Sequence, residues 1–170
     1  MNDHLITVVE ADLARTYHQD ATVQLLNAYA MDPMGDGKPL SEMARRDLIP
    51  GLRQHPTTMV FLAYRGAEAV GLAICFRGFS TFAARPLVNI SDYFVAPAHR
   101  GAGIGRLLLA AIEQRAREIG CCRVTLEVQE NNHRAKRVYA AAGFNQAVYV
   151  PEAGGALCLS KPLPGSALTI

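Results

Sequence analysis

The sequence predicts a single α/β domain of the α+β type, in which helices pack on one mixed β-sheet. Apolar runs of strand length alternate along the 170 residues with segments whose apolar positions recur at helical spacing. A strand, an amphipathic helix and a second strand also follow one another between 87 and 128, as in a strand-helix-strand unit. A chain of this length buries about two thirds of its unfolded surface. One domain over 1–162, with a loose tail over 163–170, is therefore expected.

The first part of the chain is predicted to form a strand and two helices. A strand is expected over 5–9 and a helix from about 12 to 29, because apolar residues recur at the spacing of each element. The segment 31–39 contains two prolines and two glycines, which should end that helix. Ser41 is a typical N-cap for a second helix that runs to about 54.

A β-hairpin and a further strand are expected next. Strands over 57–64 and 69–76 flank a turn at 65–68, and a strand over 87–95 follows. The stretch 79–84 between these strands is unusually apolar, so we expect it to line a ligand pocket or to form a dimer contact.

The last part of the chain contains the clearest helical periodicity. This helix begins near 104 and should end before Gly120, and its predicted apolar face consists of Ile104, Leu107, Leu108, Ala111 and Ile112. The elements expected after it are a strand over 124–128, a helix over 132–142 closed by Gly143, and short strands over 147–150 and 156–160.

Composition argues against several classes of function. The formal net charge is +2 with both signs interspersed, so no basic patch and no nucleic-acid partner are expected. No apolar stretch approaches the roughly 18 to 20 residues of a membrane span, and the polar N-terminus lacks the pattern of a signal peptide. We therefore expect a cytoplasmic protein without a membrane partner.

The cysteines and histidines do not have the spacing of a metal site or of a disulfide framework. The cysteines lie in or beside apolar runs and are interpreted as small buried hydrophobic residues: Cys75, Cys121, Cys122 and Cys158. A catalytic cysteine would need a paired histidine, for which the sequence offers no arrangement. The five histidines are scattered, without the i, i+4 pair of a zinc enzyme. No metal is expected.

The turn from Arg100 to Gly105 carries the strongest functional signal. Its three glycines alternate with other residues, between an apolar strand and a helix. Glycines lack Cβ atoms where the backbone must come close to a neighbour, and a helix N-terminus favours an anion. The spacing is not that of the dinucleotide fingerprint, and the absence of a following Gly-Lys-Ser/Thr excludes a nucleoside-triphosphate P-loop. A phosphorylated cofactor is the expected ligand.

The pattern Arg-x-x-Gly-x-Gly resembles the loop that holds the pyrophosphate of acetyl-CoA in the GNAT superfamily of N-acetyltransferases. Arg100, Gly103 and Gly105 match that loop, and Val95-Ala96-Pro97 is similar to the segment that precedes it. A second segment, Asn132-x-x-Ala135-x-x-x-Tyr139-x-x-x-Gly143-Phe144, resembles the second signature of the superfamily. The two segments occur in the order that the superfamily has.

The resemblance implies the GNAT acyl-CoA N-acyltransferase fold, with a mostly antiparallel central sheet, acetyl-CoA as co-substrate and a homodimer. It implies cofactor contacts from the strand end, the glycine-rich turn and the later helix, namely Phe94, Val95, Arg100, Gly101, Ala102, Gly103, Ile104, Gly105, Arg106 and Asn132. It also implies that Tyr139 protonates the thiolate that leaves, a role that suits a phenol.

The general base remains open between two carboxylates. Asp92 lies on the strand that approaches the thioester, but strand alternation puts it on the face opposite Ser91 and Tyr93. Glu127 competes from the neighbouring strand. Either side chain could instead be structural, Asp92 through hydrogen bonds to a turn and Glu127 as a solvated strand residue.

The segment from Gly71 to Gly105 is similar to the diamine and spermidine/spermine-type acetyltransferases, which implies a small polyamine-like acceptor. Ser91 stands where those enzymes carry a glutamate that is thought to act as base, so the carboxylate role would pass to Asp92 or to water. The expected reaction is direct acetyl transfer to a primary amine in a ternary complex. Acetylation of a protein or peptide amine, and a regulatory acyl-CoA-binding module without turnover, are the alternatives.

Overall fold

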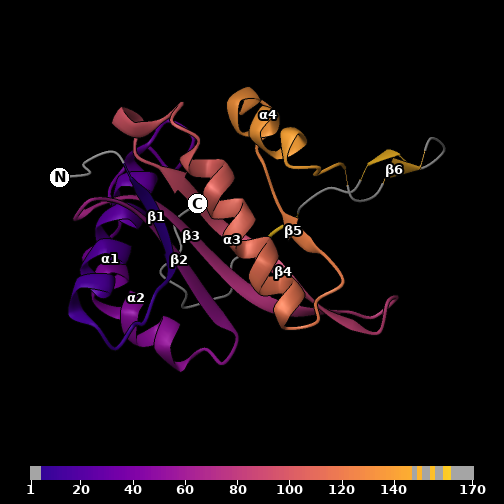
Figure 1. Ribbon diagram of the computed structural model, residues 1–170, viewed down its shortest axis with the longest axis horizontal. Helices are drawn as coiled ribbons and strands as arrows, with labels where there is room; N and C mark the ends of the chain where they lie inside the picture. The colour runs from indigo at the N-terminus through magenta and orange to yellow at the C-terminus, as the bar shows by residue number, and fades with distance from the viewer. Residues whose placement is uncertain (1–4, 147–148, 151–153, 156–158, 162–170) are drawn as a thin grey trace.

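One mixed sheet organises the computed structural model, which describes residues 5–146, 149–150, 154–155 and 159–161 (Figure 1). Its strands are β1 (Ile6–Glu10), β2 (Thr58–Arg65), β3 (Glu68–Ser80), β4 (Arg85–Val95) and β5 (Val124–Leu126). They lie in sequential order, antiparallel from β1 to β4 and parallel between β4 and β5. The predicted fold class, a mostly antiparallel sheet flanked by helices, is confirmed.

Helices cover both faces of this sheet. The helices are α1 (Thr16–Met31), α2 (Glu42–Gln54), α3 (Ile104–Glu118) and α4 (His133–Ala141), with a short 3₁₀ helix, η1 (Pro97–His99), before α3. One apolar cluster joins α1 and α2 to the sheet, and a second joins α3 and α4 to its other face. Figure 1 shows α3 in front of the sheet. Because β2 and β3 are covered on both sides, their central residues form continuous buried runs.

A side chain caps the start of α2, whereas the N-cap residue of α1 makes no such hydrogen bond. The Oγ of Ser41 accepts a hydrogen bond of 3.1 Å from the N–H of Ala44, which confirms the predicted N-cap of α2. α1 begins at Thr16, later than predicted. Asp12 instead forms a turn, in which its carboxylate accepts from the N–H of Ala14 and its own N–H donates to Nδ1 of His18.

The buried face of α3 is shifted to one side of the predicted face. The helix buries Ile104, Leu108, Leu109, Ile112 and Ala116, whereas Leu107 is 43% exposed. Residues 104, 108 and 112 form a row along the helix that belongs to both the predicted and the observed face. The prediction extended this row on the side of Leu107 and Ala111. The sheet contacts the other side of that row, and this choice of side depends on the angle at which α3 packs.

The elements after β4 are shorter than predicted. β5 keeps the first three residues of the expected 124–128, and α4 keeps the central part of the expected 132–142. β6 (Tyr149–Val150) and β7 (Gly154–Gly155) form a separate antiparallel pair. The second expected strand, 156–160, lies largely outside the described residues. None of the helices in the described ranges is long and apolar enough to cross a membrane.

The interpretation of the cysteines as buried residues needs correction. Cys75 is buried as expected, and burial raises the pKa of its thiol to about 12, but Cys122 is exposed and Cys121 only partly buried. These two cysteines follow Gly120 in the turn between α3 and β5, where the N–H of Cys122 bonds to the carbonyl of Pro86. Cys158 lies outside the described residues. The apolar stretch 79–84 forms the end of the β3–β4 hairpin, where Phe82 is fully exposed.

We expect Leu108→Ala to lower the free energy of unfolding by about 2–5 kcal/mol, because the side chain is completely buried between α3 and the sheet. Leu107→Ala is the matched control on the same helix and should change stability little. Urea denaturation of both variants measures the difference. Equal losses would contradict the observed orientation of α3.

Candidate functional site

A cavity of about 780 Å³ lies where β4 and β5 separate. The two strands pair only at Val88–Val124, Asn89–Thr125 and Ile90–Leu126. β5 then ends, while β4 continues to Val95. From 91 to 95, the edge of β4 that faces away from β3 therefore has no strand partner among the described residues, and its backbone groups can bond to an extended ligand.

The cavity brings together most of the predicted site residues. From the predicted cofactor contacts it is lined by Phe94, Val95, Arg100, Gly101, Gly103, Ile104, Gly105, Arg106 and Asn132. Tyr139 and Glu127 also line it, whereas Ala102 and Asp92 do not. The stretch 79–84 contributes no residue to the lining. Segments that are far apart in the sequence thus meet at one hollow, as the two motifs predict.

The first two glycines of the turn are required by backbone conformation. Gly101 and Gly103 have φ angles of +84° and +79°, in the left-handed region. A Cβ on Gly101 would meet open space, and one on Gly103 would lie 3.7 Å from the nearest heavy atom, in Arg106. Gly103 is the N-cap residue of α3, so the free N–H groups of this helix open towards the cavity. This arrangement suits an anion such as a phosphate.

Gly105 is required for a different reason, which is contact with a tyrosine. The hydroxyl of Tyr93 donates a hydrogen bond of 2.5 Å to the carbonyl of Gly105. A Cβ on Gly105 would lie only 2.7 Å from that hydroxyl oxygen. The third glycine therefore makes room for a protein side chain, whereas the motif alone suggested a ligand.

Tyr139 lies on α4 next to Tyr93. The centroids of the two rings are 5.5 Å apart at an interplanar angle of 61°, and Phe144 packs on the other side of Tyr139. Burial raises the pKa of the Tyr139 hydroxyl, and the charge of Tyr29 adds to the effect. The phenol therefore keeps its proton at neutral pH, as a proton donor must.

Asn132 starts the helix that carries Tyr139. Its Oδ1 accepts a hydrogen bond of 3.1 Å from the N–H of Ala135, so it is the N-cap of α4. It also lines the cavity. The asparagine thus sets where α4 begins, and so helps to fix the position of Tyr139 along the cavity wall.

The two candidate bases lie in different surroundings. A β-bulge between β3 and β4 leaves Ser91 without a partner, so that Cys75 pairs with Ile90 and Ile74 with Asp92. Asp92 consequently shares the face of Ile74, towards α1 and α2, and burial raises the pKa of its carboxyl group. Tyr93 faces α3, as alternation predicts, but the bulge interrupts the alternation at Ser91.

Glu127 is exposed at the end of β5 and lines the cavity. Tyr29, near the end of α1, also lines the cavity. It lies close enough to Asp92 to be affected by the charge of that carboxylate. Burial raises the pKa of the Tyr29 hydroxyl, and the charges of Asp92, Asp32 and Asp36 raise it further. Asp92 and Asp36 therefore place negative charge near the α1 side of the cavity, while Asp32 is paired with Arg100.

Tyr29 and Tyr93 are among the lining residues that sequence reasoning did not propose for the site. Tyr93 could have been found by alternation, since it lies two residues before Val95 on the same strand. Tyr29 lies near the end of α1, and no motif marks it. Arg100 binds Asp32 in an ion pair of 2.6 Å, so this segment is joined directly to the glycine-rich turn.

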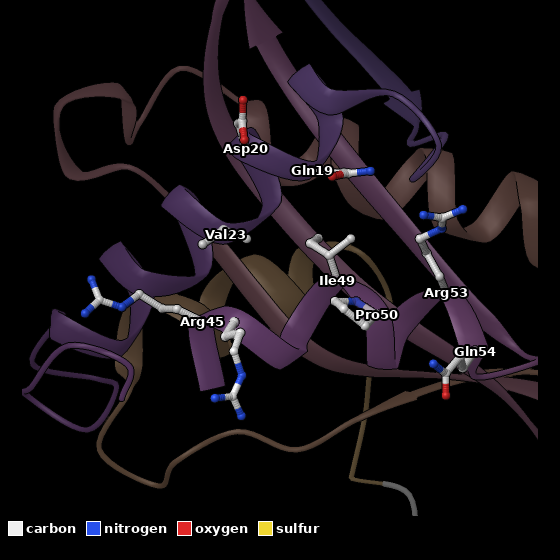
Figure 2. A pocket seen from close by; sticks show the side chains of 9 residues that line it. Gln19, Asp20, Val23, Arg45, Ile49, Pro50, Arg53 and Gln54 are labelled. Carbon is white, nitrogen blue, oxygen red and sulfur yellow. The ribbon is translucent and has the colours of Figure 1, made fainter. Parts of the chain in front are cut away.

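A second hollow of about 650 Å³ lies between α1 and α2. Figure 2 shows Val23 and Ile49 in its middle, with Arg45 and Arg53 at opposite ends. None of the predicted site residues lines it. Among the described residues, no group of three or more histidine, cysteine or acidic side chains has an arrangement that could hold a metal ion.

We expect Gly105→Ala to lower the free energy of unfolding by roughly 1–3 kcal/mol, because the new Cβ must displace the Tyr93 hydroxyl. In a Tyr93→Phe background the nearest ring atom is 3.7 Å away, so the same change should be neutral or stabilising, as alanine favours a helix. Thermal unfolding of the native protein, the two single variants and the double variant measures both effects on stability. An equal loss in both backgrounds would contradict the contact.

Comparison with known proteins identifies the family. The model of the Acetyltransferase (GNAT) family matches residues 21–144. The chain is 39% identical over 85 residues to streptothricin acetyltransferase of Streptomyces lavendulae, which is 45% of either chain. It is 32% identical over 79 residues to thialysine N-epsilon-acetyltransferase of Bos taurus, which is 46% of either chain. The chain spans about half the length of such relatives.

Solved structures show the same fold. A crystal structure of an aminoglycoside acetyltransferase from an uncultured soil metagenomic sample, in complex with sisomicin, superimposes with a TM-score of 0.74. The match covers 96% of this chain and 99% of that one, at 18% sequence identity. The family model spans well over half of the chain and includes both motifs that line the cavity. The chain therefore belongs to the Acetyltransferase (GNAT) family.

Proposed function

We propose that the protein transfers an acetyl group from acetyl-CoA to a primary amine of a small molecule, directly and within a ternary complex. The observation that carries this proposal is the cavity between β4 and β5, which has a helix N-terminus at one end and the protonated Tyr139 on its wall. Family membership supports acetyl transfer to an amine.

The residues around the cavity fit acetyl-CoA as co-substrate. Gly101 and Gly103 leave the N-terminus of α3 open to a pyrophosphate, and Arg106 lies beside them on the same lining. The free edge of β4 up to Val95 offers backbone groups to the extended pantetheine arm. The thioester supplies the activated acetyl group. The N–H groups at the end of β4 are the proposed donors to the carbonyl oxygen during attack.

Two proton transfers accompany the reaction. An amine with a pKa near 10.4 is protonated at pH 7, and exposing its lone pair costs roughly 4–5 kcal/mol, so a base must take that proton. The amine nitrogen then bonds to the acetyl carbon and the carbon–sulfur bond breaks. Tyr139 gives its proton to the departing sulfur. Asp92 is the proposed base, and it would act through water, because it does not itself line the cavity but lies close enough to affect Tyr29, which does. Burial raises the pKa of its carboxyl group, which makes it a stronger base than an ordinary carboxylate.

A cationic, polyamine-like acceptor is the proposed substrate class. Asp92 and Asp36 place negative charge near Tyr29, which lines the cavity, whereas the charge of Asp32 is offset by its ion pair with Arg100. Such a field attracts an ammonium group. The relatives streptothricin acetyltransferase and thialysine N-epsilon-acetyltransferase are, by their names, acetyltransferases of small molecules. Both similarities favour a small amine over a protein amine.

Release of free CoA thiol from acetyl-CoA tests the function. The purified protein is offered separate pools of diamines, amino acids, aminoglycosides and peptides, and release with the diamine pool is the expected result. Release with peptides alone would contradict a small-molecule acceptor. Binding of acetyl-CoA without release in any pool would favour a regulatory module over an enzyme.

We expect Tyr139→Phe to lower kcat about 10²-fold or more and to leave the Kd of acetyl-CoA nearly unchanged, since only the transferable proton is lost. Rapid-mixing kinetics and calorimetry separate the two quantities. Phe144→Leu, which alters the other neighbour of Tyr139 without removing a proton donor, is the control for packing. An unchanged kcat in the tyrosine variant would remove Tyr139 from the mechanism.

We expect Asp92→Asn to abolish the fall of kcat/KM at low pH. In the native enzyme the base works only when deprotonated, so the rate falls as pH drops through the raised pKa of Asp92. The matched control is Glu127→Gln, which should keep this acidic limb. If the glutamate variant loses the limb and the aspartate variant keeps it, Glu127 is the base.

The same aspartate variant should also be more stable than the native protein at pH 7. Because the pKa of Asp92 is raised by folding, its charged form is disfavoured in the folded state, and stability is lost as pH rises above the unfolded value near 3.8. The difference in Tm between the two proteins should therefore shrink as pH falls towards 3.8. A less stable variant at pH 7 would show that the carboxylate is structural.

A further inference from the structure

We propose that Arg100 is a positioning residue, which ties the segment after α1 to the end of β4 and so holds the acceptor side and the cofactor side of the cavity in one geometry. This inference rests on the proposed function, because it assigns the α1 side of the cavity to the acceptor. It differs from the role that the motif implies, in which the arginine contacts the cofactor.

The guanidinium of Arg100 already has protein partners. Its Nε donates a hydrogen bond of 2.8 Å to the carbonyl of Val95, and its Nη2 donates one of 2.6 Å to Oδ2 of Asp32. Its central carbon lies 5.5 Å from the centroid of the Phe94 ring. One side chain thus contacts the last two residues of β4 and a carboxylate 68 positions away in the sequence.

Asp32 is held equally firmly. Its side chain is only 6% exposed, and its second oxygen, Oδ1, accepts a hydrogen bond of 2.9 Å from the N–H of Met34. Burial raises the pKa of this carboxyl group, but the bonds from Arg100 and from the Met34 N–H outweigh burial and hold it below its ordinary value. Both oxygens are occupied, so the ion pair has one defined geometry.

This pair can couple the two halves of the site because of where its ends lie. Asp32 is the C-cap residue of α1, and Tyr29, Asp32 and Met34 all line the cavity. Val95 ends β4, at the opening between the strands. Because Arg100 binds both the carbonyl of Val95 and the carboxylate of Asp32, the end of β4 and the end of α1 cannot move independently. A lysine could not replace this arginine, because one ammonium group does not span two acceptors in a fixed fork.

The test compares Arg100→Lys, Asp32→Asn and the double variant. The asparagine keeps an oxygen for the Met34 N–H and removes only the charge that Arg100 binds. We expect each single change to raise the KM of the acceptor about tenfold and to alter the Kd of acetyl-CoA less than threefold. The KM of the acceptor in the double variant should be no higher than in the more impaired single variant, because both changes break the same link.

Hydrogen exchange gives a readout that does not depend on activity. Backbone amides of 32–35 and 94–96 should exchange faster in both single variants. Arg106→Gln serves as the control for a cofactor contact: it should weaken acetyl-CoA binding and leave these amides unchanged. If Arg100→Lys weakens acetyl-CoA binding more than tenfold while exchange at 32–35 stays as in the native protein, Arg100 is a phosphate ligand and the proposal is overturned.

The two proposals can fail separately. Faster exchange at both segments in a protein that acetylates none of the offered amines would support the link between α1 and β4, and it would count against the proposed function alone. If the effects of the two changes on the KM of the acceptor add up in the double variant, and the amides of 32–35 and 94–96 exchange as in the native protein, the link is overturned and the proposed function stays in place.

Discussion

The separation of β4 from β5 after Ile90 is the constraint on which the rest of the site depends. β5 pairs with only three residues of β4 before it ends, and the longer strand is left with a free edge. A free edge exposes backbone donors and acceptors that need partners. The protein surrounds this edge with α4, the glycine-rich turn and the end of α1, and the cavity is the space that remains.

The sheet can keep such an opening because it is rigid elsewhere. Apolar clusters cover both faces of β2 and β3, and α3 packs against the strands through residues that are almost completely buried. Close packing of this kind resists deformation, so a gap at one edge does not collapse. The β-bulge at Ser91 adds a second effect, because it turns Asp92 towards α1 and Tyr93 towards α3.

Several motif residues next to the cavity make contacts within the protein, where the motifs alone suggest contacts with a ligand. Gly105 accommodates the hydroxyl of Tyr93, and Arg100 binds Asp32 and the carbonyl of Val95. Both contacts join segments far apart in the sequence and fix backbone positions at the cavity wall. Preorganisation of this kind is what a group-transfer site requires, since donors must already lie in place when charge develops.

Local sequence was sufficient for the elements and for most of the site. Ser41 and Asn132 cap helices through bonds to residues three positions away, and the positive φ angles of Gly101 and Gly103 follow from the turn itself. Such interactions act within one turn of the chain, so the sequence by itself determined them. It also determined the family, through two motifs of fixed spacing.

Tertiary structure alone decided which side of α3 is buried, where the bulge interrupts β4, and that Asp32 meets Arg100. Each of these depends on how one element packs against another. A helix shows the same periodicity whichever neighbouring stripe it buries, and an acidic residue after α1 shows no sign of a partner 68 positions away. The physical reason is that these contacts exist only after the layers have come together. Helix packing gains its free energy from burial, whereas the ion pair gains it from bonds that outweigh the cost of burial.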